Sequence, residues 1–500
     1  MKINIYIPLC FTLLMILTLT IGCEKEEEKQ EQLPVLTTSM ASEITKSSAV
    51  CGGNVSSDGG SVVISRGVCW SSTKNPTIAN SKTIDGTGTG AFSSSITGLL
   101  ANTTYFVRAY ATNNSGTAYG TEISFTTNME SNPQFNIFKI IDGKEICNII
   151  KTNDGGYIGI AYSDDYNVMK FDSDFNVIWD KTYGGSKGDY VESIIQTNDG
   201  GYIVIGETKS SDGDVTLNHG DYDIWLCKLD VDGNMTWEKS YGGTNTESVS
   251  GENSIQQTID GGYVFIGGTN SDDGDVSLNH GGHDVWLVKI SSIGDIEYEK
   301  TYGGSNNDYG RKVISTNSIF TLLITSGSNN GDFNKSGNWV VQINQSWGII
   351  WKTNVFALNS GSLINTTDGD FIVVNTSSQD FLLNRLGSDG TVKLTKTISF
   401  QSILPKQPSA EKILQTANNG FIIIGSVLLG DDADALLFKV NPDFNLIYSK
   451  IYSGSYWDVS CTLIPVTGNT YFYQFYTFSR DIPNVNYSCS EASVVVKVEE

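Results

Sequence analysis

The pentapeptide Asn153-Asp154-Gly155-Gly156-Tyr157 recurs in nearly the same form as Asn198-Asp199-Gly200-Gly201-Tyr202 and Ile259-Asp260-Gly261-Gly262-Tyr263. Four weaker copies keep an aromatic residue at the last position, namely Phe320, Phe371, Phe421 and Phe472. The first and last of these aromatic residues are 315 positions apart, so the six intervals average 52.5 residues. A period of this length fits one four-stranded blade of a β-propeller. We therefore predict an all-β fold with a seven-bladed β-propeller over residues 135–500.

The second copy shows the strands of one blade. Four apolar or alternating runs occupy residues 191–197, 201–208, 222–229 and 234–241, and Asp-Gly turns separate the first pair and the last pair. The seventh copy has only three such runs before the chain ends. Residues 135–139, Phe-Asn-Ile-Phe-Lys, match the outer strand that it lacks, so we expect an N-terminal strand to close the ring. An open array and a six-bladed ring are the alternatives.

Residues 34–127 form a separate segment that is rich in Ser, Thr and Gly, with short alternating strands. This pattern predicts a small β-sandwich. The run at residues 99–113, Leu-Leu-Ala-Asn-Thr-Thr-Tyr-Phe-Val-Arg-Ala-Tyr-Ala-Thr-Asn, resembles the penultimate strand of fibronectin type III domains. The resemblance implies that Tyr105 forms a tyrosine corner and that Trp70 lies in the core. It implies a spacer or weak binding module, and residues 128–134 would link it to the propeller.

The N-terminus has the layout of a secretory signal. Lys2 is followed by an apolar stretch to Leu19, and Gly22 precedes Cys23. Residues 20–23, Thr-Ile-Gly-Cys, resemble the lipobox of bacterial lipoproteins, which implies cleavage after residue 22 and a lipid on Cys23. An acidic tether follows at residues 23–33, and its residues 24–28, Glu-Lys-Glu-Glu-Glu, resemble the export signal of Bacteroidota surface lipoproteins; the alternative is a solvated spacer. We expect an outer-membrane protein anchored by its lipid and facing the cell exterior.

Charge and cysteine content limit the partners. The formal charge of −23 becomes −24 when Lys2 is removed, and such an acidic chain repels phosphates, so we expect no nucleic-acid binding. We expect a monomer. Cysteines in an exported protein can form disulfides, and the candidates are Cys51 with Cys69 and Cys461 with Cys489. Cys147 and Cys227 lie in apolar strands, where buried free thiols are expected.

Two long loops between the second and third strands of neighbouring blades carry the candidate metal ligands. Carboxylates around a glycine turn suit calcium, and the candidate ligands are Asp212, Asp214, Asp272, Asp273 and Asp275. The alternative is that these aspartates only form turns. All three histidines, His219, His280 and His283, lie in the same loops, where they could bind a ligand or a metal, act as acid–base groups, or cap the loops by hydrogen bonds.

Another repeated set follows the outer strands. Tyr183, Tyr241 and Tyr302 each precede Gly-Gly and are candidate aromatic platforms for a sugar, although Gly-Gly there also fits a plain turn. These turns and the long loops are expected on one face, which is the predicted binding face. Taken together, the chain resembles Bacteroidota surface lipoproteins in which a fibronectin type III-like domain precedes a propeller with DGGY and WxKTYGG repeats.

No motif indicates an enzyme. The chain has no Gly-x-Ser-x-Gly elbow, no HExxH and no phosphate-binding glycine loop. We therefore predict a non-catalytic surface protein that presents a β-propeller for binding of glycan or protein. One alternative is a carbohydrate-active enzyme that uses carboxylates of the loop face. The other is a structural surface module stiffened by calcium, which is the candidate cofactor.

Overall fold

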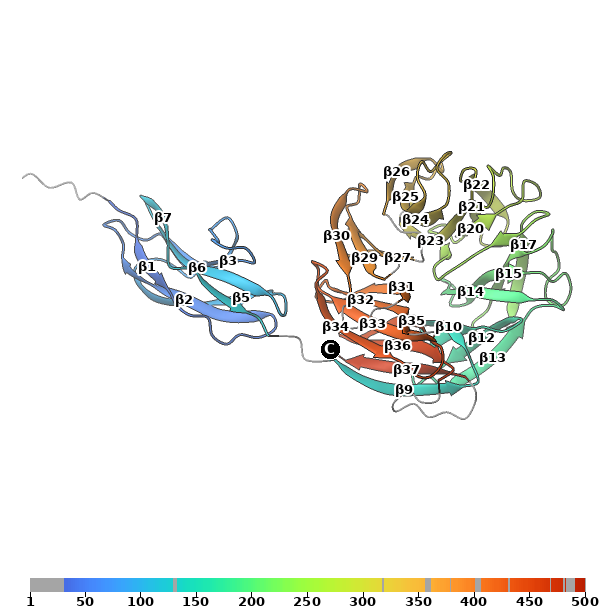
Figure 1. The fold of residues 1–500 in the computed structure, drawn as a ribbon, viewed down its shortest axis with the longest axis horizontal. Coiled ribbons are helices and arrows are strands. Elements are labelled where there is room, and N and C mark those ends of the chain that lie inside the picture. Colours follow the sequence, from blue (N-terminus) through green and yellow to red (C-terminus); the bar gives the residue numbers. More distant parts are fainter. Residues whose placement is uncertain are drawn as a thin grey trace, which may run out of the picture. The chain divides into compact units, whose positions relative to one another are not determined.

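The computed structural model describes residues 31–128, 133–316, 319–355, 361–377, 379–400, 406–429, 432–467, 469–479, 482 and 491–499. The predicted signal segment, Cys23, most of the acidic tether and Cys489 lie outside this part. The chain divides into two compact units, Met1–Met129 and Glu130–Glu500. Every described element is a β-strand (Figure 1). The described residues accordingly contain no helix long and apolar enough to cross a membrane.

The first unit consists of two antiparallel sheets. One sheet has the order β1 (Val35–Thr38), β2 (Ser48–Ser57) and β5 (Gly90–Thr97). The other contains β4 (Ser81–Lys82), β3 (Ser65–Ser71), β6 (Thr104–Asn113), β7 (Gly116–Tyr119) and β8 (Ile123–Thr126), with β8 also paired to β6.

The core of this unit is built from alternate residues of both sheets. Val68, Ile96 and Val107 are fully buried, whereas Trp70 is only partly buried at the edge of the cluster. Tyr105 is buried, and its hydroxyl accepts a hydrogen bond of 3.0 Å from the Leu100 N–H, which is the contact expected of a tyrosine corner.

The predicted disulfide between Cys51 and Cys69 is wrong, because both residues are buried free thiols. Cys51 lies on β2 of one sheet and its thiol contacts the Ser39 carbonyl at 3.3 Å. Cys69 lies on β3 of the other sheet and contacts the Pro76 carbonyl at 3.5 Å. Each thiol therefore fills its own site in the core. Cys461 is also a free thiol, and Cys147 and Cys227 are free as predicted.

The second unit is a β-propeller of four-stranded antiparallel sheets. We number the blades by their order in the chain. Blades 1 and 2 contain β10 (Ile146–Lys151), β11 (Tyr157–Ala161), β12 (Tyr166–Phe171), β13 (Val177–Tyr183), β14 (Asp189–Gln196), β15 (Tyr202–Thr208), β16 (Asp223–Leu229) and β17 (Met235–Tyr241). Blade 3 has a first strand in two pieces and contains β18 (Glu247–Ser248), β19 (Ile255–Gln257), β20 (Tyr263–Thr269), β21 (Asp284–Ile290) and β22 (Ile296–Tyr302).

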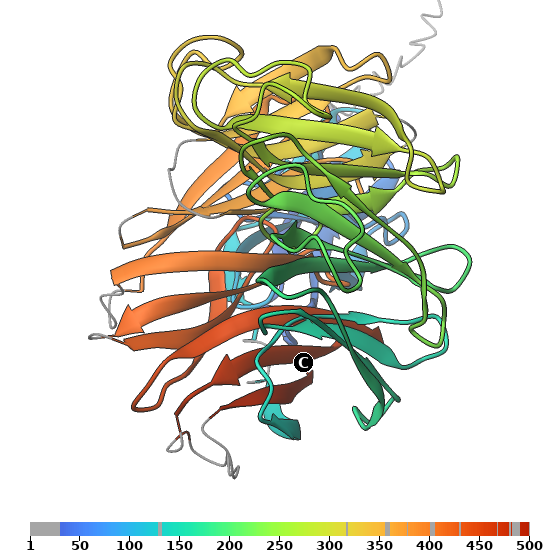
Figure 2. The same cartoon turned by 90° about the vertical axis from the view of Figure 1, so that its right-hand side faces the viewer.

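The remaining sheets follow the same order. Blades 4 and 5 contain β23 (Asp308–Thr316), β24 (Ile319–Ser326), β25 (Gly337–Ile343), β26 (Ile349–Asn354), β27 (Gly361–Asn365), β28 (Phe371–Thr376), β29 (Phe381–Leu386) and β30 (Val392–Ile398). Blade 6 contains β31 (Lys406–Gln415), β32 (Phe421–Leu429), β33 (Asp432–Val440) and β34 (Leu446–Tyr452). Figure 1 shows the labelled first strands β10, β14, β23, β27, β31 and β35 (Asp458–Thr467) nearest the centre of the unit, and Figure 2 shows the same fold turned by 90°.

The last sheet joins the two ends of the propeller. It consists of β35 (Asp458–Thr467), β36 (Thr470–Thr477), β37 (Ala492–Glu499) and the N-terminal strand β9 (Gln134–Asp142). Strand β9 pairs antiparallel with β37 from Asp142 opposite Ala492 to Gln134 opposite Glu499. The pairing expected for residues 135–139 is therefore present, and main-chain hydrogen bonds connect the start of the unit to its end.

The repeated Asp-Gly-Gly motif makes the turn between the first two strands of a blade. Gly200 has a φ of 86°, a conformation that favours glycine. The Asp199 carboxylate accepts a hydrogen bond of 3.0 Å from the Gly201 N–H, and Lys228 Nζ on the third strand lies 2.9 Å from it. Burial raises the pKa of the Asp199 carboxyl, but hydrogen bonds from the Thr197 and Lys228 side chains outweigh this effect and lower the pKa to about 2. The motif is thus structural, and its spacing positions the strands around the centre.

Candidate functional site

The aspartates of the two long loops support the turns that follow the outer strands. Asp212 accepts a hydrogen bond of 2.8 Å from the Ser186 N–H, and Asp273 accepts the equivalent bond of 2.8 Å from Thr244. The N–H groups of the first glycines in the Gly-Gly turns donate to Asp214 at 3.1 Å and to Asp275 at 3.2 Å. Asp272 is exposed.

This arrangement favours the turn alternative over calcium binding. Among the described residues, no group of three or more His, Cys, Asp or Glu side chains is placed to hold a metal ion. Calcium needs six to eight oxygen ligands, and four of these carboxylates are already engaged with backbone N–H groups. The aspartates therefore stabilise the loops through the neighbouring blade.

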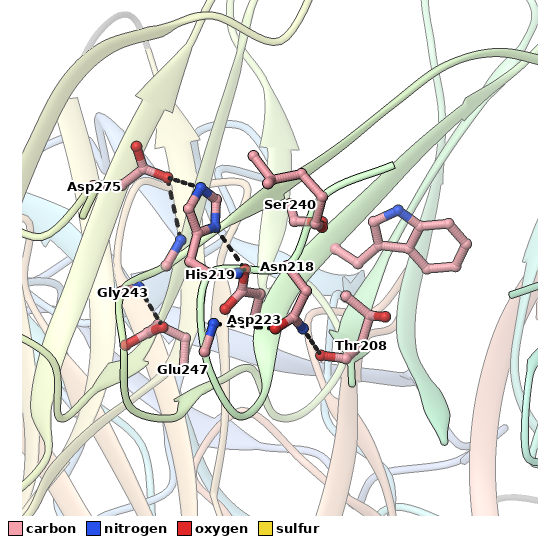
Figure 3. A network of polar contacts seen from close by, with 12 residues as sticks. Thr208, Asn218, His219, Asp223, Ser240, Gly243, Glu247 and Asp275 are labelled. Atoms are coloured by element: carbon pink, nitrogen blue, oxygen red, sulfur yellow. Dashed lines mark hydrogen bonds and ion pairs between the residues drawn. The ribbon is translucent and has the colours of Figure 1, made fainter. Parts of the chain in front are cut away.

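Two of the three histidines cap the loops in which they lie. Figure 3 shows His219 between Asp223 and Asp275. Its Nδ1 lies 2.6 Å from an Asp223 carboxylate oxygen, which also accepts the His219 backbone N–H at 2.7 Å. His280 makes the same two contacts with Asp284. The loop-capping alternative is confirmed for both residues.

His283 has a different environment. Its ring packs against Tyr309 with 5.3 Å between the ring centroids, and burial lowers its pKa. Its backbone N–H donates to Asn307, so the residue also helps to hold the loop. The three histidines are not brought together into one site.

The prediction that Tyr183, Tyr241 and Tyr302 form aromatic platforms is wrong. All three side chains are buried. The hydroxyl of Tyr241 donates 2.7 Å to the Gly294 carbonyl, and that of Tyr302 donates 2.8 Å to the Trp347 carbonyl. Each acceptor lies in the turn between the last two strands of the next blade, and Tyr183 bonds to Gly233 in the same way. These tyrosines therefore join neighbouring blades and cannot stack on a ligand.

A candidate site lies instead in the central channel, at irregularities of the innermost strands. The pairing of the first with the second strand skips one residue in five blades, which is the signature of a β-bulge. The skipped residues are Cys147, Glu192, Arg311, Glu411 and Cys461. All five line one cavity of about 320 Å³. The bulges thus direct unlike side chains from different blades into one space.

A short segment of blade 3 extends into the same space. Residues 249–254 separate β18 from β19 and replace the regular innermost strand. The Gly251 N–H donates 3.3 Å to Glu192, and Arg311 Nη1 donates 2.7 Å to the Ser250 hydroxyl. Glu252 forms an ion pair of 2.9 Å with Lys412 of blade 6. The segment therefore connects to blades 2, 4 and 6 and borders the cavity.

Burial changes the ionisation of several groups that line the cavity. Burial raises the pKa of Glu192 to about 7, and the Gly251 N–H and Arg311 offset this only in part. Burial also lowers the pKa of Lys312 to about 8. Glu411 is open to the channel, yet desolvation by the surrounding protein raises its pKa. Burial disfavours the charged form in each case.

Two tyrosines contribute aromatic surface to the cavity. Tyr162 directly follows β11 and Tyr476 is near the end of β36, so both come from the ends of second strands. Their rings meet edge-on with 6.2 Å between the centroids. Tyr162 is 51% exposed, which is high for an aromatic residue in the wall of a cavity. Aromatic faces of this kind are available to a ligand.

A larger cavity of about 620 Å³ lies beneath the Asp-Gly-Gly turns near blades 3 and 4. Its cation Lys289 is neutralised by Asp260 at 3.0 Å and by Glu297 at 2.7 Å. Its other lining residues belong mainly to the turn repeat. We favour the central cavity as the functional site because its side chains do not repeat and its charges are less well compensated.

The residues of the central cavity were not predicted from the sequence. They share a position relative to the repeated aromatic residue, which they precede by 10 residues in blades 1, 2 and 6, by 9 in blade 4 and by 11 in the last sheet. The repeat would thus have revealed one position at which Cys, Glu and Arg replace one another. The bulge that points this position inward has no local sequence signal of its own.

Comparison with known proteins identifies no family. No protein-family model matches the chain, and no curated protein matches it. Solved structures with a similar fold include a protein named as the Dos1 propeller, which is 9% identical, with 78% of this chain and 89% of that chain covered and a TM-score of 0.43.

Two Bacteroides proteins are also similar. A protein of unknown function from Bacteroides caccae is 11% identical over 64% of this chain and 94% of that chain, with a TM-score of 0.36. A quinoprotein alcohol dehydrogenase-like protein from Bacteroides thetaiotaomicron is 10% identical over 82% of this chain and 92% of that chain, also with a TM-score of 0.36. The propeller assignment rests on the sheet topology of this chain itself.

Proposed function

We propose that this protein is a non-catalytic surface lipoprotein whose seven-bladed β-propeller binds its ligand, a glycan or a protein segment, in the central cavity. One observation carries the proposal. The bulged positions of five blades direct Cys147, Glu192, Arg311, Glu411 and Cys461 into the same space. Elsewhere the repeat preserves structural side chains from blade to blade, so unlike residues that converge on one cavity favour a ligand-binding role.

The segments that precede the propeller would attach it to the membrane and hold it at a distance. Lipid on Cys23 would hold the chain at the outer membrane, and the acidic tether would separate the lipid from the folded units. The first unit would act as a fibronectin type III-like spacer, which is supported by its two sheets and by the Tyr105–Leu100 contact. Such an arrangement would present the propeller away from the membrane.

A binding screen with matched variants tests the location of the site. The purified protein is applied to a glycan array and to a panel of extracellular proteins, and each binder is measured again with Arg311→Ala and Asp272→Ala. We expect Arg311→Ala to abolish binding and Asp272→Ala, in an exposed loop, to leave it unchanged. The opposite pattern would place the ligand on the loop face and contradict the proposal.

A glycosidase is the second candidate function, and a specific observation favours it. Glu192 and Glu207 interact, and burial together with the charge of Glu192 raises the pKa of Glu207 to about 7. A carboxyl group with a raised pKa can act as a general acid near neutral pH. Turnover of any polysaccharide that is lost in both Glu192→Gln and Glu207→Gln would establish this function in place of simple binding.

A further inference from the structure

Two cations of the central cavity form no ion pair with a carboxylate of the described residues, although the charge of Arg311 is felt by Glu192 and lowers the pKa of that carboxyl. Arg311 uses Nη1 for the Ser250 hydroxyl at 2.7 Å and Nε for the Thr325 hydroxyl at 3.3 Å, and its guanidinium lies 5.5 Å from the centroid of the Tyr309 ring. Within the described residues it forms no ion pair, and Nη2 makes no hydrogen bond.

Lys312 is adjacent in sequence and is only 7% exposed. Its ammonium group donates to the Ser362 hydroxyl at 3.3 Å and forms no ion pair with the described part of the chain. Burying a cation without a counter-charge is unfavourable, so a site of this kind is stabilised when an anion enters it. Arg311 and Lys312 would therefore be stabilised by an anionic group that binds between them.

The carboxyl groups of the cavity compensate this charge poorly. Glu252 is already paired with Lys412 at 2.9 Å. Glu192 and Glu411 both have raised pKa values, so each holds a proton more readily than a solvated glutamate does. Burial also lowers the pKa of Lys312, to about 8, so Arg311 is the cation that keeps its charge over the whole neutral range, in a chain whose formal net charge is −23. An anionic ligand would be attracted to the cavity even though the surface as a whole repels it.

The other surfaces of the cavity suit a sugar ring. Tyr162 and Tyr476 offer aromatic faces, while Glu192 and Glu411 can donate or accept hydrogen bonds to hydroxyl groups. A volume of about 320 Å³ lies at the lower end of the range for small-molecule sites, which is about 300–1,000 Å³. A simple inorganic anion would leave the aromatic surface unused.

We infer that the central cavity binds an acidic sugar, a uronic acid unit whose carboxylate is held by Arg311 and Lys312 and whose ring packs against Tyr162 or Tyr476. This inference rests on the proposed function and specifies its ligand class. Arginine is suited to the task because its planar guanidinium can donate two parallel hydrogen bonds to one carboxylate.

Calorimetric titration of the full-length protein tests the inference. The probes are D-glucuronate and D-galacturonate, their neutral parents D-glucose and D-galactose, and the simple anions acetate, phosphate and sulfate. We expect at least one uronate to bind more than tenfold more tightly than its neutral parent and than any simple anion. Arg311→Ala should weaken that binding more than tenfold, whereas Lys187→Ala, which removes an exposed cation outside the cavity, should not change it.

Other results would overturn the inference in distinguishable ways. Equal binding of a neutral sugar, still sensitive to Arg311→Ala, would refute the acidic ligand but leave the proposed function intact. Equal binding of acetate, phosphate or sulfate would reduce the site to a general anion site. Absence of any binder on both the titration panel and the glycan and protein screens would overturn the inference and the proposed function together. If Arg311→Ala does not fold, Arg311→Lys and the ligand preference of the wild-type protein decide the question.

Discussion

Glu192 keeps its proton in the folded protein over a pH range in which a solvated glutamate loses it, because burial raises its pKa to about 7. The unfolded chain, with a pKa near 4.5 for this group, binds fewer protons than the folded chain between these two values. The free energy of unfolding that Glu192 contributes is therefore fully present below about pH 4.5 and decreases as the pH rises towards 7.

We expect Glu192→Gln to flatten this dependence. Relative to the wild type, the variant should gain up to about 3 kcal/mol of stability between pH 4.5 and 7, and water in the channel would reduce this value. Urea unfolding at a series of pH values measures the effect. Glu207 and Asp458 also have pKa values raised to about 7, so they lower the free energy of unfolding of both proteins over the same pH range. The effect of Glu192 is therefore the difference between the wild type and Glu192→Gln at each pH. Glu43→Gln, at an exposed site of the first unit, should show no such difference.

Loops and strands differ in how far the sequence predicts them. The Asp-Gly-Gly turns were predicted correctly, because glycine at positive φ and an aspartate that binds the turn are local requirements. The bulge at Glu192 was not predicted, since it depends on the register between β14 and β15 and not on any turn residue. The predicted role of the repeated tyrosines as aromatic platforms was wrong for a related reason. Tyr241 meets its acceptor in the next blade, which a single repeat does not reveal.

The long loop of blade 3 provides a test of the turn role of its aspartates. Asp273 accepts hydrogen bonds from the Thr244 N–H at 2.8 Å and from its hydroxyl at 3.2 Å. Because Asp273→Ala removes both, we expect it to lower the free energy of unfolding by about 1–2 kcal/mol. The loss should be the same with calcium and with chelator. A wild-type unfolding midpoint that rises with calcium, but not in Asp273→Ala, would restore the calcium hypothesis.

Closure of the propeller depends on two strands from opposite ends of the second unit. Ile137 on β9 is opposite Val496 on β37 and packs against the cluster that also contains Tyr473. A ring of this kind has no free terminal blade, so disruption of the pairing between β9 and β37, which we call the seam, should destabilise every blade. An open array would instead lose only its last sheet, because each repeat would contact its neighbours alone.

Replacement of Ile137 by aspartate distinguishes these two behaviours. Ile137→Asp places a carboxylate against the apolar cluster and should lower the free energy of unfolding by about 2–3 kcal/mol. Asn136→Asp introduces the same residue at the neighbouring exposed position of β9 and serves as the control, with an expected change below about 0.5 kcal/mol. Tryptophan fluorescence reports the reach of the damage, since the fully buried Trp225 and Trp286 lie in blades 2 and 3, away from the seam. If the ring unfolds as one unit, the unfolding transition seen by tryptophan fluorescence should occur at a lower temperature in Ile137→Asp, and β37 should become open to proteolysis over the same temperature range. Proteolysis of β37 without a change in the fluorescence transition would show that the blades unfold independently.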